Sequence, residues 1–313
     1  MTNSAASTAV LIPCYNEATT IAKVVSDFRS CLPAADIYVF DNNSTDGSGM
    51  LASQAGAAVI NEKRQGKGFV VASMLQKVYA DYYIMVDGDD TYPADACIHL
   101  LNPLKNAEAD MVVGQRLTGF EKGSFRPFHV FGNRMICALM NTIFNSRLKD
   151  PLSGYRAFTR EVALQLPVVA IGFDIETELT LQMLYRHMVI HEVPVHYRSR
   201  PSGSSSKLNT FKDGFRVLFK IFSILRSYKP LTFFGSLAIL SEIVALTAGI
   251  FIIRSLNAGE NVSVILAVAC SSFFIIGIFF ASIGIILNSL NFRLLENMSA
   301  LEKQIRWIKE NKD

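Results

Sequence analysis

Two long apolar runs near the C-terminal end constrain this chain more than any other feature. Leu231–Ile253 and Val262–Leu287 are each long enough to cross the roughly 30 Å hydrocarbon core of a bilayer as a helix. A helical hairpin buried in a soluble core is the alternative, but soluble cores rarely contain two such runs in succession. We therefore predict two transmembrane helices, over residues 231–253 and 262–287.

Basic residues flank these runs on their outer sides, whereas the short segment between them has only Arg254. The flanking residues are Lys207, Lys212, Arg216, Lys220, Arg226 and Lys229 before the first run, and Arg293, Lys303, Arg306, Lys309 and Lys312 after the second. Lysine and arginine concentrate on the cytoplasmic side of membrane helices. The first eight residues show no secretory-signal pattern. We therefore expect a multi-pass protein of the inner or plasma membrane, with its N-terminal domain and both termini in the cytoplasm.

The segments around the expected spans suggest further divisions of the chain. Residues 1–207 read as a soluble domain, residues 208–230 as an amphipathic juxtamembrane helix and residues 288–313 as a cytoplasmic C-terminal helix. A linker helix packed on the soluble domain is an equal alternative for residues 208–230. The chain has 30 basic and 27 acidic residues, a formal net charge of +3. That charge is too small to indicate a nucleic-acid partner, and the bilayer is the expected one.

Two features inside the spans bear on association. Glu242 lies near the middle of the first span, where an ionisable group is costly and is a functional candidate by default. The simpler interpretation is a protonated carboxyl bonded to a neighbouring helix or subunit. Ala245 and Gly249, like Gly277 and Ala281, have a spacing of small residues that permits close helix contact, including contact between copies in a homo-oligomer.

The first 115 residues alternate short β-rich runs with helical patterns. Such a rhythm predicts an α/β domain with a mainly parallel sheet and helices on both faces. The predicted strands are Thr8–Pro13, Ile37–Asp41, Ala57–Asn61, Tyr82–Asp87 and Asp110–Gly114, and the predicted helices cover about 18–31, 45–55, 67–80 and 94–105.

A polar cluster follows each of the first four predicted strands. These clusters are PCYNE at 13–17, DNNSTDGS at 41–48, RQGKG at 64–68 and DGDD at 87–90. Ligands of parallel sheets bind beyond the carboxyl ends of the strands. We therefore expect the four clusters to meet at one ligand site.

The pair Asp87 and Asp89, separated by Gly88, has the spacing at which two carboxylates can share a divalent cation. A hard cation such as Mg²⁺ or Mn²⁺ prefers oxygen ligands and commonly keeps substrate phosphates in its shell. Acidic turns are common, so the Asp87–Asp89 pair alone is weak evidence for a metal site. The other three polar clusters strengthen this evidence.

With these motifs the chain resembles family-2 glycosyltransferases of the GT-A fold, a group that includes polyprenyl-phosphate sugar transferases such as dolichyl-phosphate mannose synthase. The resemblance runs from residue 8 to about residue 210. It implies a Rossmann-like catalytic domain, a nucleotide-sugar donor and a metal cofactor, Mg²⁺ or Mn²⁺.

The resemblance also implies roles for individual residues. The base and ribose of the nucleotide-sugar would be held by Pro13, Tyr15, Glu17 and Asp41, and Asn42 would belong to the same nucleotide-sugar site. Asp87 and Gly88 would lie near the nucleotide, and Asp89, with Asp87, would bind the metal on the diphosphate. Lys67 would approach the nucleotide or phosphate, although a solvated turn lysine is an equal alternative. Arg200 and Lys207 would fold over the diphosphate.

Two positions depart from the family pattern. The family often has a second aspartate where this chain has Asn42, and the mannose synthases carry a glutamine where this chain has Thr91. The departures weaken any transfer of base preference or metal shell to this chain.

On the acceptor side, the resemblance places arginines against an acceptor phosphate, and Arg116, Arg126 and Arg134 are the candidates. A surface ion pair is the alternative for each. Asp150 is the candidate for a catalytic base or an orienting carboxylate. Asp174 and Glu176, in the run Gly172–Glu178, either border the sugar pocket or cap the following helix at its positive end.

The resulting expectation is an inverting transfer of a sugar from a UDP- or GDP-sugar to a polyprenyl phosphate at the cytoplasmic membrane face. One alternative is a synthase-like enzyme that acts on a hydroxyl or a polysaccharide, for which Gln304–Trp307 supplies an incomplete Q-x-x-R-W element. The other is a non-catalytic membrane scaffold that binds sugar nucleotides. The sequence leaves the sugar, the base and the lipid length open.

Overall fold

The computed structural model describes residues 6–116, 127–166, 175–199, 219, 222–259 and 261–310. The chain divides into two compact units, Met1–Gly214 and Phe215–Asp313. The expected boundary at residue 207 lies outside the described residues, as do Arg126, Asp174, Arg200 and Lys207.

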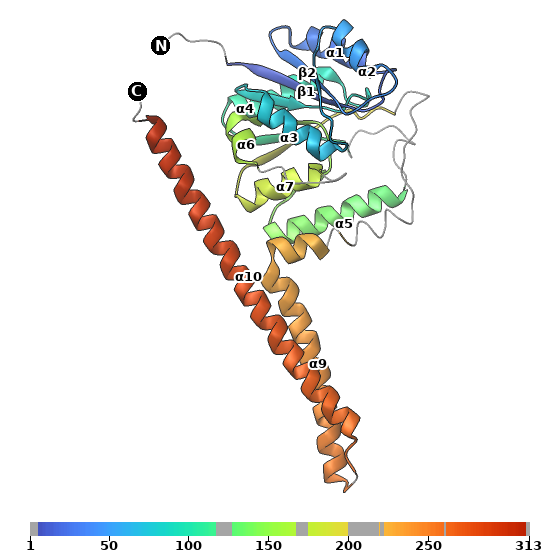
Figure 1. The fold of residues 1–313 in the computed structure, drawn as a ribbon, viewed down its shortest axis with the longest axis vertical. Coiled ribbons are helices and arrows are strands. Elements are labelled where there is room, and N and C mark those ends of the chain that lie inside the picture. The colour runs from blue at the N-terminus through green and yellow to red at the C-terminus, as the bar shows by residue number, and fades with distance from the viewer. Residues whose placement is uncertain are drawn as a thin grey trace. The chain divides into compact units, whose positions relative to one another are not determined.

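The first unit is built on a mixed, mostly parallel sheet (Figure 1). Its strands are β1 (Thr8–Cys14), β2 (Asp36–Asp41), β3 (Ala58–Asn61), β4 (Tyr82–Met85), β5 (Met111–Gln115), β6 (Arg156–Thr159) and β7 (Ile190–Pro194). Their order across the described sheet is β3-β2-β1-β4-β6-β5-β7. The five predicted strands are confirmed, with ends that differ by one or two residues. The predicted mainly parallel sheet is therefore correct.

Strand β6 is one of the elements that the sequence did not predict. It runs antiparallel to both β4 and β5, with Arg156 opposite Met85 on one side and Val113 on the other. An antiparallel strand begins at the edge where its parallel neighbours end. The residues just before β6 are therefore brought to the carboxyl ends of β1 to β5, which is the expected ligand edge.

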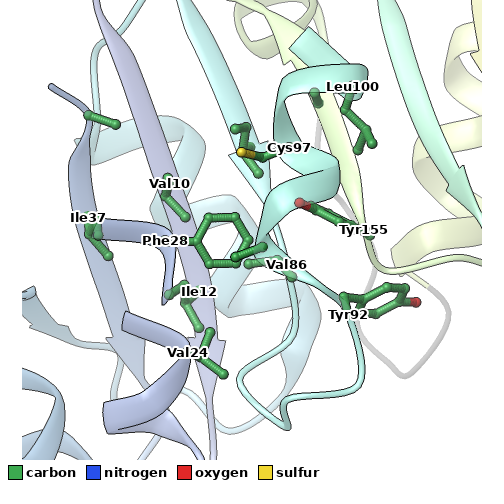
Figure 2. Packing of buried hydrophobic residues seen from close by; sticks show 14 of the residues in the cluster. Val10, Ile12, Val24, Phe28, Ile37, Val86, Tyr92, Cys97, Leu100 and Tyr155 are labelled. Atoms are coloured by element: carbon green, nitrogen blue, oxygen red, sulfur yellow. The ribbon is translucent and has the colours of Figure 1, made fainter. Parts of the chain in front are cut away.

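Helices cover both faces of the sheet because alternate residues of each strand point to opposite sides. The helices are α1 (Ile21–Cys31), α2 (Ser48–Gln54), α3 (Lys67–Lys77), α4 (Cys97–Lys105) after the short 3₁₀ helix η1 (Ala94–Ala96), α5 (Pro127–Phe144), α6 (Arg160–Gln165) and α7 (Ile175–Tyr185). On one face, Val10 and Ile12 of β1 pack with residues of α1 and α4 (Figure 2). On the other, Ala9 and Leu11 pack with residues of α3, α6 and α7. Because β1 is buried on both faces, its sequence is apolar throughout rather than alternating.

The second unit contains α9 (Pro230–Asn257) and α10 (Val264–Glu310). Both are long and apolar enough to cross a membrane, by length and composition. Helix α10 continues without a break to Glu310, so the expected second span and the expected C-terminal helix form one element. Of the expected helix over 208–230, the structure describes residue 219 and residues 222–230, and 222–228 are helical.

Helices α9 and α10 pack antiparallel (Figure 1). The residues of α9 that are buried after its first residue are Ala238, Ser241, Ala245 and Ala248, which are all small. Ser241 Oγ donates to the carbonyl of Phe273 at 2.7 Å. A β-carbon on Gly277 would stand 2.9 Å from Cδ of Glu242, so the Glu242 side chain occupies the notch that this glycine leaves. The carboxyl of Glu242 therefore lies against the neighbouring helix of its own hairpin, and Gly277 is used inside the hairpin. Association of copies remains a prediction.

Candidate functional site

The loops that follow β1 and β2 are joined by main-chain to side-chain hydrogen bonds. The amide of Asn16 donates to Ser44 Oγ at 3.0 Å, and the amide of Thr45 donates to Asn16 Oδ1 at 2.8 Å. Asn16 has a φ of 56°, in the left-handed region that asparagine tolerates better than most residues. This turn leaves Tyr15 exposed and Glu17 partly exposed at the ligand edge.

Asn42 joins the loop after β2 to the loop after β3. Its Nδ2 donates to the carbonyls of Glu62 at 2.9 Å and Arg64 at 2.8 Å, and its Oδ1 accepts from the amide of Gly66 at 2.8 Å. The side chain is buried. An aspartate could not donate these two bonds, which gives a structural reason for asparagine here. The observed contacts of Asn42 thus fix the loop that precedes Lys67.

The segment from Asp87 to Asp90 is fixed from both sides. Thr20 Oγ1 donates to the carbonyl of Gly88 at 2.7 Å, which ties the start of α1 to this loop. Asp89 is buried, and its Oδ1 accepts from the hydroxyl of Thr91 at 2.6 Å and from the amide of Thr91 at 3.2 Å. Thr91 therefore orients the Asp89 carboxylate.

Lys67 lies between two carboxylates from different elements. Its Nζ is 2.5 Å from Asp87 Oδ1 and 2.5 Å from Glu176 Oε1. Burial by itself lowers the pKa of Lys67, but the charges of Asp87 and Glu176 outweigh it and raise the pKa above its ordinary value. Lys67 is therefore a charged, tethered group rather than a solvated turn lysine.

Gly154, just before β6, faces Asp87 directly. A β-carbon at this position would stand 3.1 Å from Cγ of Asp87 and would overlap its Oδ2. The amide of Gly154 donates to the hydroxyl of Tyr92 at 3.1 Å, and this hydroxyl lies 3.2 Å from Ser153 Oγ. Glycine is thus required for the close approach of this segment to the carboxylate.

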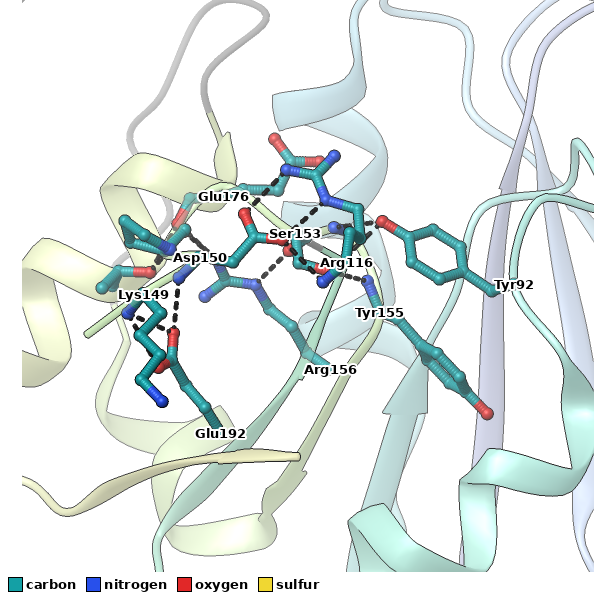
Figure 3. A network of polar contacts seen from close by, with 12 residues as sticks. Tyr92, Arg116, Lys149, Asp150, Ser153, Tyr155, Arg156, Glu176 and Glu192 are labelled. Atoms are coloured by element: carbon teal, nitrogen blue, oxygen red, sulfur yellow. Dashed lines mark hydrogen bonds and ion pairs between the residues drawn. The ribbon is translucent and has the colours of Figure 1, made fainter. Parts of the chain in front are cut away.

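Arg156 is fully buried beneath the same segment (Figure 3). Its guanidinium donates to the carbonyls of Pro151 at 2.6 Å, Ser153 at 2.9 Å and Glu176 at 2.9 Å. Burial is the main cause that lowers the pKa of Arg156, to about 10, so the group is charged at neutral pH. Arg156 joins the residues before β6 to the first turn of α7.

Asp150 and Arg116 form a buried bidentate pair (Figure 3). Nε of Arg116 donates to Oδ2 of Asp150 and its NH2 donates to Oδ1, both at 2.9 Å. The main-chain amide of Arg116 also donates to Oδ2 at 2.9 Å, and the Asp150 side chain is wholly buried. Of the two roles expected for Asp150, this geometry fits an orienting carboxylate better than a base.

The residues that fit a divalent cation are Asp87 and Asp89. Within the ranges that the structure describes, no group of three or more histidine, cysteine, aspartate or glutamate side chains is placed to hold a metal. Magnesium is usually bound by one or two carboxylates together with substrate phosphates, so two aspartates suffice. Asp87 Oδ1 is paired with Lys67, and Asp89 Oδ1 accepts from the hydroxyl of Thr91.

Most of the remaining predicted residues lie at the ligand edge of the sheet, and Arg134 lies on a helix. The structure brings the loops that carry Pro13, Tyr15, Glu17, Asp41 and Lys67 to one edge of the sheet with Asp87 and Asp89. Arg134 is an exposed residue of α5. The sequence reasoning missed Arg156 as a buried support and left the role of Glu176 open. Only the acidic first turn of α7 pointed to Glu176.

A separate cavity of about 780 Å³ opens beside the edge strand β7. Residues near the ends of α5 and α7 line it, together with β7 and Gln115, and neither Asp87 nor Asp89 contributes to it.

Comparison with known proteins identifies the family of this chain. Residues 9–166 match the family model described as glycosyl transferase family 2. The glycosyltransferase AglJ of Haloferax volcanii is 36% identical over 244 residues, which cover 78% of this chain and 80% of that protein. A dolichyl-phosphate hexose transferase of the same organism is 28% identical over 206 residues, 66% of this chain and 88% of that one.

Among solved structures, a glucosyl-3-phosphoglycerate synthase of Mycobacterium tuberculosis has a similar fold. The TM-score is 0.58 at 22% identity, over 72% of this chain and 80% of that one. The family match spans half of the chain, and the first relative is similar over most of both chains. The chain therefore belongs to glycosyltransferase family 2.

Proposed function

We propose that this glycosyltransferase moves a sugar from a nucleotide-diphosphate sugar to a polyprenyl phosphate, with inversion, at the cytoplasmic face of the inner or plasma membrane. The observation that carries the proposal is that one chain joins a family 2 catalytic domain to two helices long enough to cross a bilayer. A membrane-embedded lipid acceptor explains why a sugar transferase has such helices. The relative named as a dolichyl-phosphate hexose transferase supports the same acceptor class.

On the sugar-donor side, Asp89 would hold a divalent cation, Mg²⁺ or Mn²⁺, for the diphosphate, and Asp87 and Lys67 belong to the same ligand edge. When bound, the cation neutralises the charge that develops on the departing nucleoside diphosphate. The structurally similar synthase was crystallised with Mn²⁺ and UDP-glucose, which supports this cofactor class. Pro13, Tyr15, Glu17 and Asp41 hold the base and ribose. Asn42 acts through the loop that it fixes.

On the acceptor side, the pairing of Asp150 favours a phosphate over a hydroxyl. A hydroxyl nucleophile needs a base to remove its proton. Both Asp150 oxygens accept from Arg116, so the carboxylate is poorly placed for that task. A phosphate monoester has a second pKa near 6 and is already largely ionised at neutral pH, so it needs little help from a base.

Cations remain necessary, because sugar donor and acceptor together bring several phosphate charges into one site. Arg116, Arg126 and Arg134 offset the charge of the acceptor phosphate, and Arg200 and Lys207 that of the diphosphate. Arg116 contributes in part by positioning Asp150, to which it is bonded.

The test uses the full-length protein in nanodiscs with Mn²⁺ or Mg²⁺. A panel of UDP- and GDP-sugars is incubated with undecaprenyl or dolichyl phosphate, and glycolipid is followed by mass spectrometry. The expected product carries one sugar, and Asp89→Asn should reduce its formation by about 100-fold or more. Asp90→Asn is the matched control, because Asp90 pairs with Lys23 and its φ of 57° suits asparagine. A polymeric product, or transfer only to hydroxyl acceptors, would reject the proposed acceptor.

A further inference from the structure

Glu176 contributes one of the two contacts that fix the Lys67 ammonium. Lys67 opens α3, Asp87 follows β4 and Glu176 lies in the first turn of α7, so three separate elements meet at one charged atom. The side chains of Lys67 and Asp87 are about three-quarters buried, and that of Glu176 is 11% exposed. The contact is therefore largely shielded from solvent. Salt screens such partly buried ion pairs less than it screens ion pairs at the surface.

Hydrogen bonds to its main-chain carbonyl fix the position of Glu176. Its main-chain carbonyl accepts from the buried guanidinium of Arg156 at 2.9 Å and from the hydroxyl of Thr180 at 3.0 Å. Arg156 also holds Pro151 and Ser153, which precede the glycine that touches Asp87. One buried arginine thus joins the turn that carries Glu176 to the segment that leads to Gly154 beside Asp87.

A lysine held at one carboxylate keeps much of the freedom of its four-carbon stem. A second carboxylate on the other side removes that freedom and fixes the ammonium at one point. At the ligand edge, a fixed cation next to Asp87 is where a diphosphate would need it, because preorganised charge costs no reorganisation when the sugar donor binds.

We infer that Glu176 is a positioning residue, which holds Lys67 beside Asp87 so that the lysine is preorganised for the diphosphate of the sugar donor. The inference rests on the proposed function for its substrate class. It differs from a direct role of Glu176 as a base on the acceptor, because Glu176 acts only through Lys67.

The test compares four full-length proteins in detergent: wild type, Glu176→Gln, Lys67→Met and the double variant. The affinity for UDP or GDP in the presence of Mn²⁺ is measured by calorimetry, and transfer is measured separately. Glu176→Gln should weaken nucleoside diphosphate binding by about 10-fold, as should Lys67→Met. The double variant should bind no more weakly than the weaker single variant, because one interaction is removed twice.

Two further variants separate positioning from stability. Glu178 lies in the same helical turn as Glu176 and accepts a hydrogen bond from Gln182. The control substitution Glu178→Gln should therefore leave nucleoside diphosphate affinity and turnover unchanged. Glu176→Asp keeps the charge and should recover part of the lost affinity, which a purely structural defect would not do.

The inference is overturned if the two single effects multiply in the double variant. It is also overturned if Glu176→Gln keeps wild-type diphosphate affinity but loses the acidic limb of the pH–rate profile, which is the behaviour of a base. A wild-type protein that binds diphosphate but transfers nothing to lipid phosphate would reject the proposed acceptor, and the affinity measurements would still decide the role of Glu176.

Discussion

The substitution Gly154→Ala tests the closest approach in the candidate site. The new methyl group would stand 3.1 Å from Cγ of Asp87, nearer still to Oδ2, whereas non-bonded carbon atoms prefer about 3.5–4.0 Å. The main chain is held by the bond from the Gly154 amide to buried Tyr92 and by the contacts of Arg156 to the preceding residues. The strain is therefore relieved mainly by movement of the Asp87 side chain, which also disturbs Lys67.

The expected magnitudes follow from that movement. Overpacking of a tight site costs roughly 1–3 kcal/mol of stability. A displacement of about 1 Å in a positioned group can reduce turnover about 100-fold. We therefore expect Gly154→Ala to remain folded, with a modestly lower Tm, and to lose about two orders of magnitude in glycolipid formation. Thermal unfolding in detergent and the transfer assay are measured on the same preparation.

Two further glycine-to-alanine substitutions, at positions with less crowding, serve as controls for the effect on turnover. At Gly49 a β-carbon would stand 3.0 Å from Asp41 Oδ2, so Gly49→Ala should have a smaller effect, below about 10-fold. At Gly235 no side chain and no atom from another element lies within 4 Å of the added carbon, so Gly235→Ala should leave activity unchanged. Wild-type turnover and wild-type Tm in Gly154→Ala would refute the reasoning, because Asp87 would then not need its observed position.

Three other predictions concern stability and reactivity. The hydrogen bonds from Arg64 hold the pKa of Glu62 at about 2, below its ordinary value of about 4.3. The ionised Glu62–Arg64 pair therefore stabilises the fold at neutral pH. This stabilisation is lost as the pH falls from about 4.5 towards 2. Because Arg64 is half exposed, Glu62→Gln should cost only about 1 kcal/mol at pH 7 and less at pH 3, measured by unfolding; an equal cost at both values would contradict this. Burial raises the pKa of Cys14 to about 12, so the folded protein should resist alkylation at this thiol at pH 7.5, and rapid labelling seen by mass spectrometry would count against the structure. Gly277→Ala should lower Tm because its methyl would collide with Glu242, and Glu242→Ala in the same chain should restore it; independent effects of the two changes would argue against their contact.

Much of the fold was predictable because its signals are local. The βαβ rhythm over residues 8–115 follows from runs of apolar residues bounded by turn residues, and the structure confirms these strands within one or two residues. The two apolar helices were predictable for the same reason, since length and composition alone define them. The four polar clusters were predicted to meet because parallel strands end at one edge.

Other features depend on which segments the fold brings together, and no local signal carried them. Strand β6 is four residues long and lies antiparallel in an otherwise parallel sheet, and no local pattern marks its direction. That direction decides that Gly154 touches Asp87 and that Arg156 lies beneath the site.

The sequence by itself determined which groups follow the strands, namely paired carboxylates and a glycine-rich basic turn. It also determined, as a separate feature, a pair of membrane-length helices. The tertiary structure decided how those charges are paired. Lys67 is joined to Asp87 and to Glu176, and Arg116 is joined to Asp150, although these partners are 20, 109 and 34 positions apart in the chain. Ion pairing depends on distance in space, which only the packing of helices against the sheet sets, whereas strand and helix patterns depend on neighbours along the chain.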